Sequence, residues 1–143
     1  MASTEHGDKL RILIVPFFAT SHIAPHTELA VRLAAARPGA VEPTVAVTPA
    51  NVSVVRSALD RHGHSAASNA VRIATYPFPD VDGLTPGVEN LSAAGADAWR
   101  IDAGPVDEEL TQGAQRALIP WLLPDPRRKA GRRTMICTGL SVI

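Results

Sequence analysis

A chain of 143 residues with 45% hydrophobic and 20% charged side chains has the composition of one globular domain. Its single cysteine, Cys137, excludes an internal disulfide framework and favours a reducing compartment, so we expect a cytoplasmic protein. The apolar run at residues 12–18 is too short for a membrane span and has no signal-peptide layout. The overall charge is zero, but residues 1–119 carry −4 and residues 120–143 carry +4. We therefore separate a domain at 1–119 from a basic tail at 120–143, which we expect to be irregular.

The first predicted strand covers residues 11–17 and is rich in Ile, Leu and Val, as in a strand buried on both faces. The helix that follows is expected to begin near Ile23, with Ser21 as its N-cap and Pro25 in its first turn. Its predicted buried stripe consists of Leu29, Leu33 and Ala36.

A second strand is predicted at residues 43–48, a helix at 52–61 with Asn51 as its N-cap, and a third strand at 71–76. This alternation of strands and helices, joined by short links, predicts an α/β fold with a Rossmann-like parallel sheet and flanking helices. Weaker helical patterns cover residues 91–101 and 106–118, and no element is predicted beyond residue 120.

His22 lies where the first strand passes into its helix. That junction is at the carboxyl edge of a parallel sheet, where ligands bind, so its imidazole is a candidate general base. By itself the position has a simpler structural explanation, a histidine that fills a polar gap at a helix start.

Several common sites are excluded by their missing residues. The first strand–helix turn, residues 17–22, contains no glycine, which argues against a dinucleotide-binding turn. His62 and His64 have no carboxylate or thiol beside them in the sequence, so we expect no metal site. The run RRKAGRR at residues 127–133 has the composition of a nucleic-acid-binding or nuclear-import patch. It lacks interleaved aromatic residues, so we interpret it as a solvated end and expect no nucleic-acid partner.

Three stretches, in order, resemble plant family-1 glycosyltransferases, which use UDP-sugars to glycosylate small molecules. They are PFFATSHIAPHTELAVRLA, VTPANVSVV and YPFPDVDGLTPGVENL, with Ser21 standing where glycine is common. The resemblance implies a GT-B architecture, in which two Rossmann-like domains face each other across a cleft. It places residues 1–119 in the N-terminal, acceptor-binding domain.

The resemblance also implies roles for individual residues. His22 would be the catalytic base that takes the proton of a small hydroxylated acceptor, while a UDP-sugar serves as co-substrate and no cofactor or metal is needed. Phe18 and Glu89 would be acceptor-side contacts, with core packing and a solvated loop charge as their alternatives, and Ser21 would contact the donor sugar. The family's acidic partner of the histidine is an aspartate at a later strand–loop junction. Asp125 does not follow an apolar strand and is not assigned that role.

Nothing in the 143 residues resembles the family's second domain, which binds the UDP-sugar. We therefore expect a truncated UDP-glycosyltransferase that meets its donor only when a second domain is supplied. The alternative is a non-catalytic fragment that binds a small molecule or a protein partner. A half-fold with uncovered apolar edges is also expected to self-associate.

Overall fold

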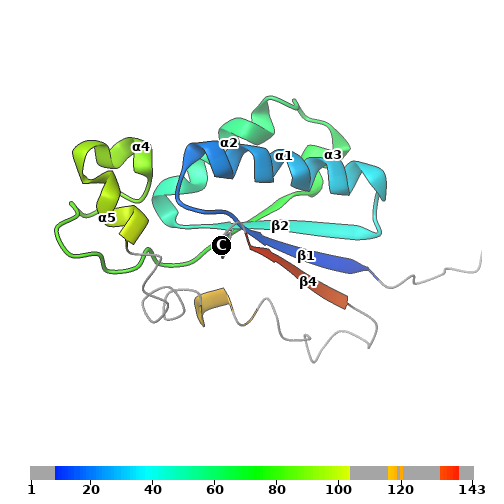
Figure 1. The fold of residues 1–143 in the computed structure, drawn as a ribbon. Coiled ribbons are helices and arrows are strands. Elements are labelled where there is room, and N and C mark those ends of the chain that lie inside the picture. The colour runs from blue at the N-terminus through cyan, green and yellow to red at the C-terminus, as the bar shows by residue number, and fades with distance from the viewer. Residues whose placement is uncertain (1–8, 104–115, 119, 121–132, 139–143) are drawn as a thin grey trace, which may run out of the picture.

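The structure is a computed structural model that describes residues 9–103, 116–118, 120 and 133–138. It contains a four-stranded sheet in the order β3-β2-β1-β4, with every neighbouring pair parallel (Figure 1). The strands are β1 (Leu10–Val15), β2 (Val41–Val47), β3 (Arg72–Thr75) and β4 (Arg133–Thr138). The predicted α/β class with a parallel sheet is confirmed.

The strands end together at one edge of the sheet. Val15 of β1 pairs with Thr138 of β4, and Val47 of β2 pairs with Thr75 of β3. The small helices α4 (Leu91–Ala94) and α5 (Ala98–Ala103) lie beyond this carboxyl edge (Figure 1). The edge where a parallel sheet binds ligands is therefore flanked by residues 77–103.

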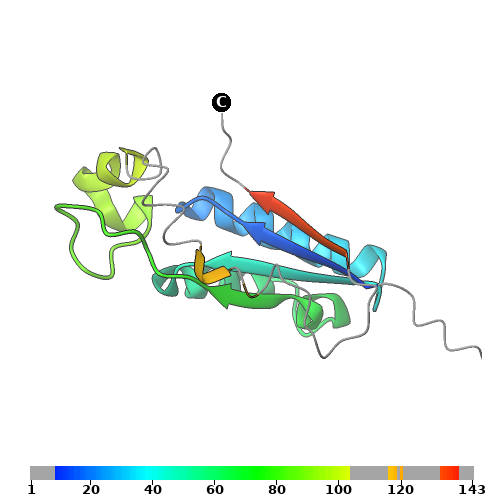
Figure 2. The same cartoon turned by 90° about the horizontal axis from the view of Figure 1, so that it is seen from below.

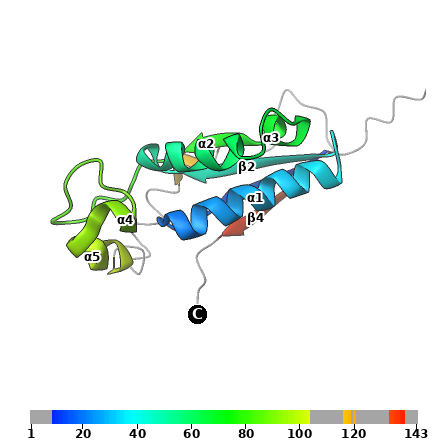
Figure 3. The ribbon, with the colours of Figure 1, turned by 90° about the horizontal axis from the view of Figure 1, so that it is seen from above.

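One face of the sheet is covered by α1 (Thr20–Ala36), α2 (Val52–Asp60) and α3 (Ala66–Ala70) (Figure 3). Alternate strand residues point toward these helices and form the larger hydrophobic cluster with them. Its most deeply buried members are Ile14, Ile23, Ala30, Val45 and Val55.

The opposite face carries the alternate residues of the same strands, including Leu13, Val15 and Ala46. These residues pack with Ile101 of α5 and Leu118 of the 3-10 turn η4 (Arg116–Leu118). Figure 2 shows η4 lying over this second face. The same strands are thus buried on both sides, as their continuous apolar sequences predict.

The helix α1 differs from its prediction at both its start and its buried face. It begins at Thr20, and its N-cap is Ala19, which makes no side-chain cap, so Ser21 lies inside the helix. The turn closes instead by a backbone bond from the Ile23 N–H to the Ala19 carbonyl at 2.9 Å. Pro25 is also inside the helix rather than in its first turn.

Of the predicted stripe of α1, Leu33 is half-buried against the core, but Leu29 and Ala36 are exposed, and other residues form the buried face. The buried residues are Ile23, Thr27, Ala30, Val31 and Ala34. Leu29 is 41% exposed. Alanine and threonine let the helix approach the strands closely, and the buried Thr27 hydroxyl is satisfied by donating to the Ile23 carbonyl at 2.8 Å.

Later elements follow the prediction with shifted limits. The strand β2 begins two residues earlier than expected, β3 is shorter, and α3 was not predicted. The helix expected at 91–101 is divided into α4, the 3-10 turn η2 (Gly95–Asp97) and α5, because Gly95 adopts a positive φ of 54°. Residues 106–115 of the helix expected at 106–118 lie outside the described residues, and 116–118 form η4.

The tail expected to be irregular contains β4, which pairs with β1 along its whole length. β4 supplies hydrogen-bond partners for the backbone groups on that edge of β1. Local sequence patterns do not predict such pairing between distant segments. Among the described residues, no helix combines the length and the hydropathy that a membrane span requires.

Candidate functional site

His22 occupies the first turn of α1, next to the carboxyl end of β1. Its backbone N–H donates to the Ala19 carbonyl at 2.9 Å. Its side chain is exposed, and the edge-on contact with the Phe17 ring has a centroid distance of 5.6 Å. The imidazole makes no hydrogen bond to the described residues.

Phe17 and Phe18 lie in different environments: Phe17 is half-buried and Phe18 is buried. Phe18 is 4% exposed, and its ring packs against Phe78 at 5.0 Å and Tyr76 at 6.4 Å between centroids. The core-packing alternative therefore describes Phe18. Phe17 is half-buried and is the aromatic residue that faces His22, which the sequence analysis missed.

Ser21 is exposed on the first turn of α1, one residue before His22. Its carbonyl lacks the usual helical donor, because Pro25 four residues later has no N–H. The polar atoms of Ser21 are therefore available at the same turn as the imidazole. Its contact with a donor sugar stays a prediction.

Glu89 is held by backbone groups at the start of the second strand–helix connection. Its Oε1 accepts the Ala50 N–H at 3.1 Å, within the turn η1 (Pro49–Asn51) that leads into α2. Its own carbonyl accepts a hydrogen bond from the Asn51 side chain at 2.8 Å. Glu89 is thus half-buried and anchored rather than a freely solvated loop charge, and its role toward an acceptor stays a prediction.

Asn51 and Asn90 form the centre of a buried polar network at the carboxyl edge. The amide of Asn90 donates to Oδ1 of Asn51 at 2.9 Å, and the amide of Asn51 donates to Thr48 Oγ1 at 2.8 Å. Asn51 makes no side-chain cap on α2, contrary to the prediction, because its side chain is used in this network. The adjacent Leu91 N–H donates to the Phe18 carbonyl at 3.0 Å, which also ties the loop to the end of β1.

Tyr76 directly follows β3. Its backbone N–H donates to the Val47 carbonyl at 3.2 Å, and its side chain is buried against Phe18. Burial raises the pKa of the Tyr76 phenol well above its usual range, and the nearby negative charge of Glu89 raises this pKa further. The phenol is therefore neutral at neutral pH.

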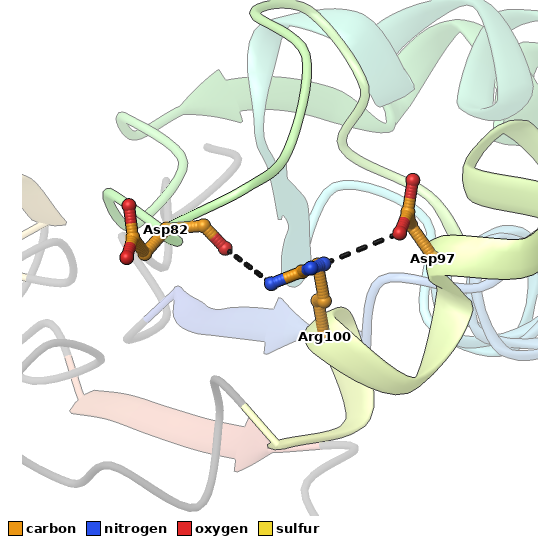
Figure 4. A network of polar contacts seen from close by, with 3 residues as sticks. All are labelled: Asp82, Asp97 and Arg100. Carbon is orange, nitrogen blue, oxygen red and sulfur yellow. Dashed lines mark hydrogen bonds and ion pairs between the residues drawn. The ribbon is translucent and has the colours of Figure 1, made fainter.

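Arg100 of α5 binds the loop around Asp82 (Figure 4). Its Nη1 donates to the Asp82 carbonyl at 3.1 Å, and its Nε lies 3.2 Å from Oδ1 of Asp97. The guanidinium also lies 4.4 Å from the centroid of Trp99, a cation–π contact on a ring that is 58% exposed. Gly83 passes so close to this guanidinium that a Cβ there would lie 2.5 Å from Nη1.

The acidic partner expected for His22 is not assigned to any residue. The carboxyl end of β4 pairs with the carboxyl end of β1, and residues 133–143 contain neither Asp nor Glu. Among the described residues, no group of three or more His, Cys, Asp or Glu side chains is arranged to hold a metal ion. The site therefore consists of an exposed imidazole, an aromatic neighbour and an anchored loop.

Three curated plant proteins are similar to this chain. Nuatigenin 3-beta-glucosyltransferase of Solanum aculeatissimum is 39% identical over 92 residues, 62% of this chain and 18% of the relative. UDP-glycosyltransferase 79A2 of Stevia rebaudiana is 32% identical over 86% of this chain and 25% of the relative. Solanidine UDP-glucose glucosyltransferase 1 of Solanum tuberosum is 32% identical over 66% and 19%. The chain thus spans a quarter or less of the length of these relatives.

A solved structure shares the fold. It is UGT73P12 of Glycyrrhiza uralensis complexed with glycyrrhetinic acid 3-O-monoglucuronide. The TM-score is 0.53 at 24% sequence identity, over 78% of this chain and 22% of that one. No protein-family model matches the sequence.

Proposed function

Because this chain is related in sequence to plant UDP-glycosyltransferases and shares the fold of a glycosyltransferase, we propose that it is the acceptor-binding part of such an enzyme. In this proposal residues 1–119 hold a small hydroxylated acceptor. The observation that carries it is the exposed imidazole of His22 at the carboxyl edge, with no hydrogen-bonded partner among the described residues.

The chemistry follows from that position. Nε2 or Nδ1 of His22 takes the proton as the acceptor oxygen attacks the anomeric carbon of a UDP-sugar. The new bond forms on the face opposite UDP, which leaves with the bonding electrons, so the configuration inverts. The UDP-sugar is a co-substrate, supplied to the site by a donor-binding domain.

The side chains around His22 determine how well its imidazole is oriented and how far the imidazolium is stabilised. The Phe17 ring restricts the rotation of the imidazole on one side. A carboxylate beside the ring would orient it and stabilise the imidazolium. The second candidate function is a half-domain that binds an acceptor without turning it over.

Two of the relatives are named for nuatigenin and solanidine, and these molecules are the first acceptors to test. The purified chain is incubated with labelled UDP-glucose and each acceptor, and acceptor binding is measured separately by calorimetry. The matched variants are His22→Gln, which removes the base at similar size, and His62→Gln, which changes an exposed histidine outside α1.

The outcomes separate the two functions. Transfer that is lost in His22→Gln and retained in His62→Gln establishes the enzyme. Binding with no transfer shows that the chain by itself binds an acceptor without turning it over. No acceptor binding by any form of the chain contradicts both. The proposed cytoplasmic location is tested by imaging a fluorescent fusion in plant cells, where accumulation in another compartment would refute it.

A further inference from the structure

A second histidine, His26, lies one helical turn after His22 on α1. Its Nδ1 is 2.6 Å from the carbonyl oxygen of His22. A carbonyl oxygen only accepts hydrogen bonds, so Nδ1 carries the hydrogen in this contact. The neutral ring therefore keeps its lone pair on Nε2.

The helix places both imidazoles on one side. Residues four apart on an α-helix have Cβ atoms about 5–6 Å from each other, and α1 is continuous across both positions. His22 is exposed and His26 is half-exposed, so solvent reaches the pair. Apart from the bond at His26 Nδ1, neither ring hydrogen-bonds to the part of the chain that the structure describes.

We propose that His22 and His26 together bind a divalent late transition-metal ion, with water completing the coordination. Imidazole is a preferred ligand of Cu²⁺, Ni²⁺ and Zn²⁺. A ligating histidine almost always donates its other ring N–H to a carbonyl or carboxylate, and the bond from His26 Nδ1 has this geometry. Two histidines spaced i, i+4 on one helix face are a recurrent pair of metal ligands.

The proposal does not depend on the proposed glycosyl transfer, but it has a consequence for it. A metal ion bound at His22 occupies the lone pair that would take the acceptor proton. Binding of the ion and proton acceptance are then mutually exclusive.

The test is a calorimetric titration of the full chain with NiCl₂ and, separately, with CuCl₂. The variants are His22→Gln, His26→Gln and the double substitution. We expect each single variant to weaken binding at the tightest site by at least about tenfold, because chelation requires both rings. The double variant should bind no more than about twofold weaker than the single variants, for the same reason.

Three controls make the result specific to the helical pair. His26→Asn keeps an amide donor for the His22 carbonyl and removes the Nε2 ligand, so it should behave as His26→Gln. His22→Ala combined with Ala24→His places the two rings two residues apart, on different sides of the helix, and should not restore binding. His62→Gln and His64→Gln should leave the tightest site unchanged.

A binding constant unaffected by His26→Gln, or lowered equally by His62→Gln, overturns the proposal. Copper electron paramagnetic resonance gives a second readout, because loss of one ring must remove one nitrogen from the hyperfine pattern. Neither measurement uses a sugar donor or an acceptor. Failure of this site is therefore distinguishable from failure of the proposed transferase function.

Discussion

Asn90 donates its side-chain amide to Oδ1 of Asn51 at 2.9 Å, across 39 positions of the sequence. Both side chains are buried, and Asn51 also reaches the Glu89 carbonyl and the Thr48 hydroxyl. This pair joins the loop before α4 to the turn before α2 at the carboxyl edge. The position of Glu89 relative to the strand ends thus depends in part on two neutral amides.

Asn51→Ala should lower the free energy of unfolding by about 2–3 kcal/mol, since it leaves several buried polar groups without partners. Urea denaturation of the chain and the variant measures this difference. Asn69→Ala, at an exposed position of α3, is the control and should change stability by less than about 0.5 kcal/mol. Equal effects of the two substitutions would show that the network contributes nothing.

Alanine substitutions at Gly83 and Gly87 can be compared to measure what the contact of Gly83 with Arg100 contributes to stability. Both have positive φ, 83° and 87°, but a Cβ at Gly87 meets nothing within 4 Å. An alanine at either position carries a backbone cost of about 1–2 kcal/mol. Gly83→Ala also displaces the Arg100 guanidinium from the Asp82 carbonyl, which adds about 1 kcal/mol.

The same comparison in an Arg100→Ala background isolates this contact. There the extra cost of Gly83→Ala over Gly87→Ala should disappear, because no guanidinium remains to be displaced. Thermal or urea unfolding of the four proteins measures the difference. A gap that persists without Arg100 would place the cost in the backbone instead.

Tyr76 is the only tyrosine in the sequence, so alkaline absorbance titration reports it directly. Burial, and then the charge of Glu89, raise its pKa above the ordinary value of 10.0. The native state therefore retains the phenolic proton at pH values where the unfolded chain loses it. Stability should be unaffected by this group below about pH 10 and should fall as the pH rises above that value.

Glu89→Gln should lower the pKa of Tyr76, because it removes the nearby charge but leaves the burial and an oxygen for the Ala50 N–H. Glu28→Gln on α1 is the control, because the Glu28 charge is not among the causes of the Tyr76 shift. An ionisation of Tyr76 at its ordinary pKa in the folded chain would contradict the buried placement of its ring.

Self-association stays a prediction. Within the described residues β3 and β4 each have a strand neighbour on one side, so the sheet retains two edges. Sedimentation velocity over a tenfold range of concentration should show a rising weight-average sedimentation coefficient. A constant coefficient that corresponds to the monomer would refute the prediction.

Local patterns in the sequence were sufficient for the strand–helix alternation from β1 to β3, because apolar periodicity and turn residues act over a few neighbouring positions. They also placed His22 at the junction where β1 passes into α1. The resemblance to plant glycosyltransferases then followed from ordered motifs, and similar plant proteins confirm it.

The tertiary structure decided what depends on distant partners. Phe17 and Phe18 are adjacent and chemically identical, and only packing turns Phe18 toward Tyr76 and leaves Phe17 beside His22. Asn51 looks like a helix cap in sequence, but its partner lies 39 positions away. The strand β4 pairs with β1, although the two segments are more than a hundred residues apart in the sequence. Local propensities do not predict such contacts, because a contact between distant segments stabilises the protein only after the fold has brought the segments together.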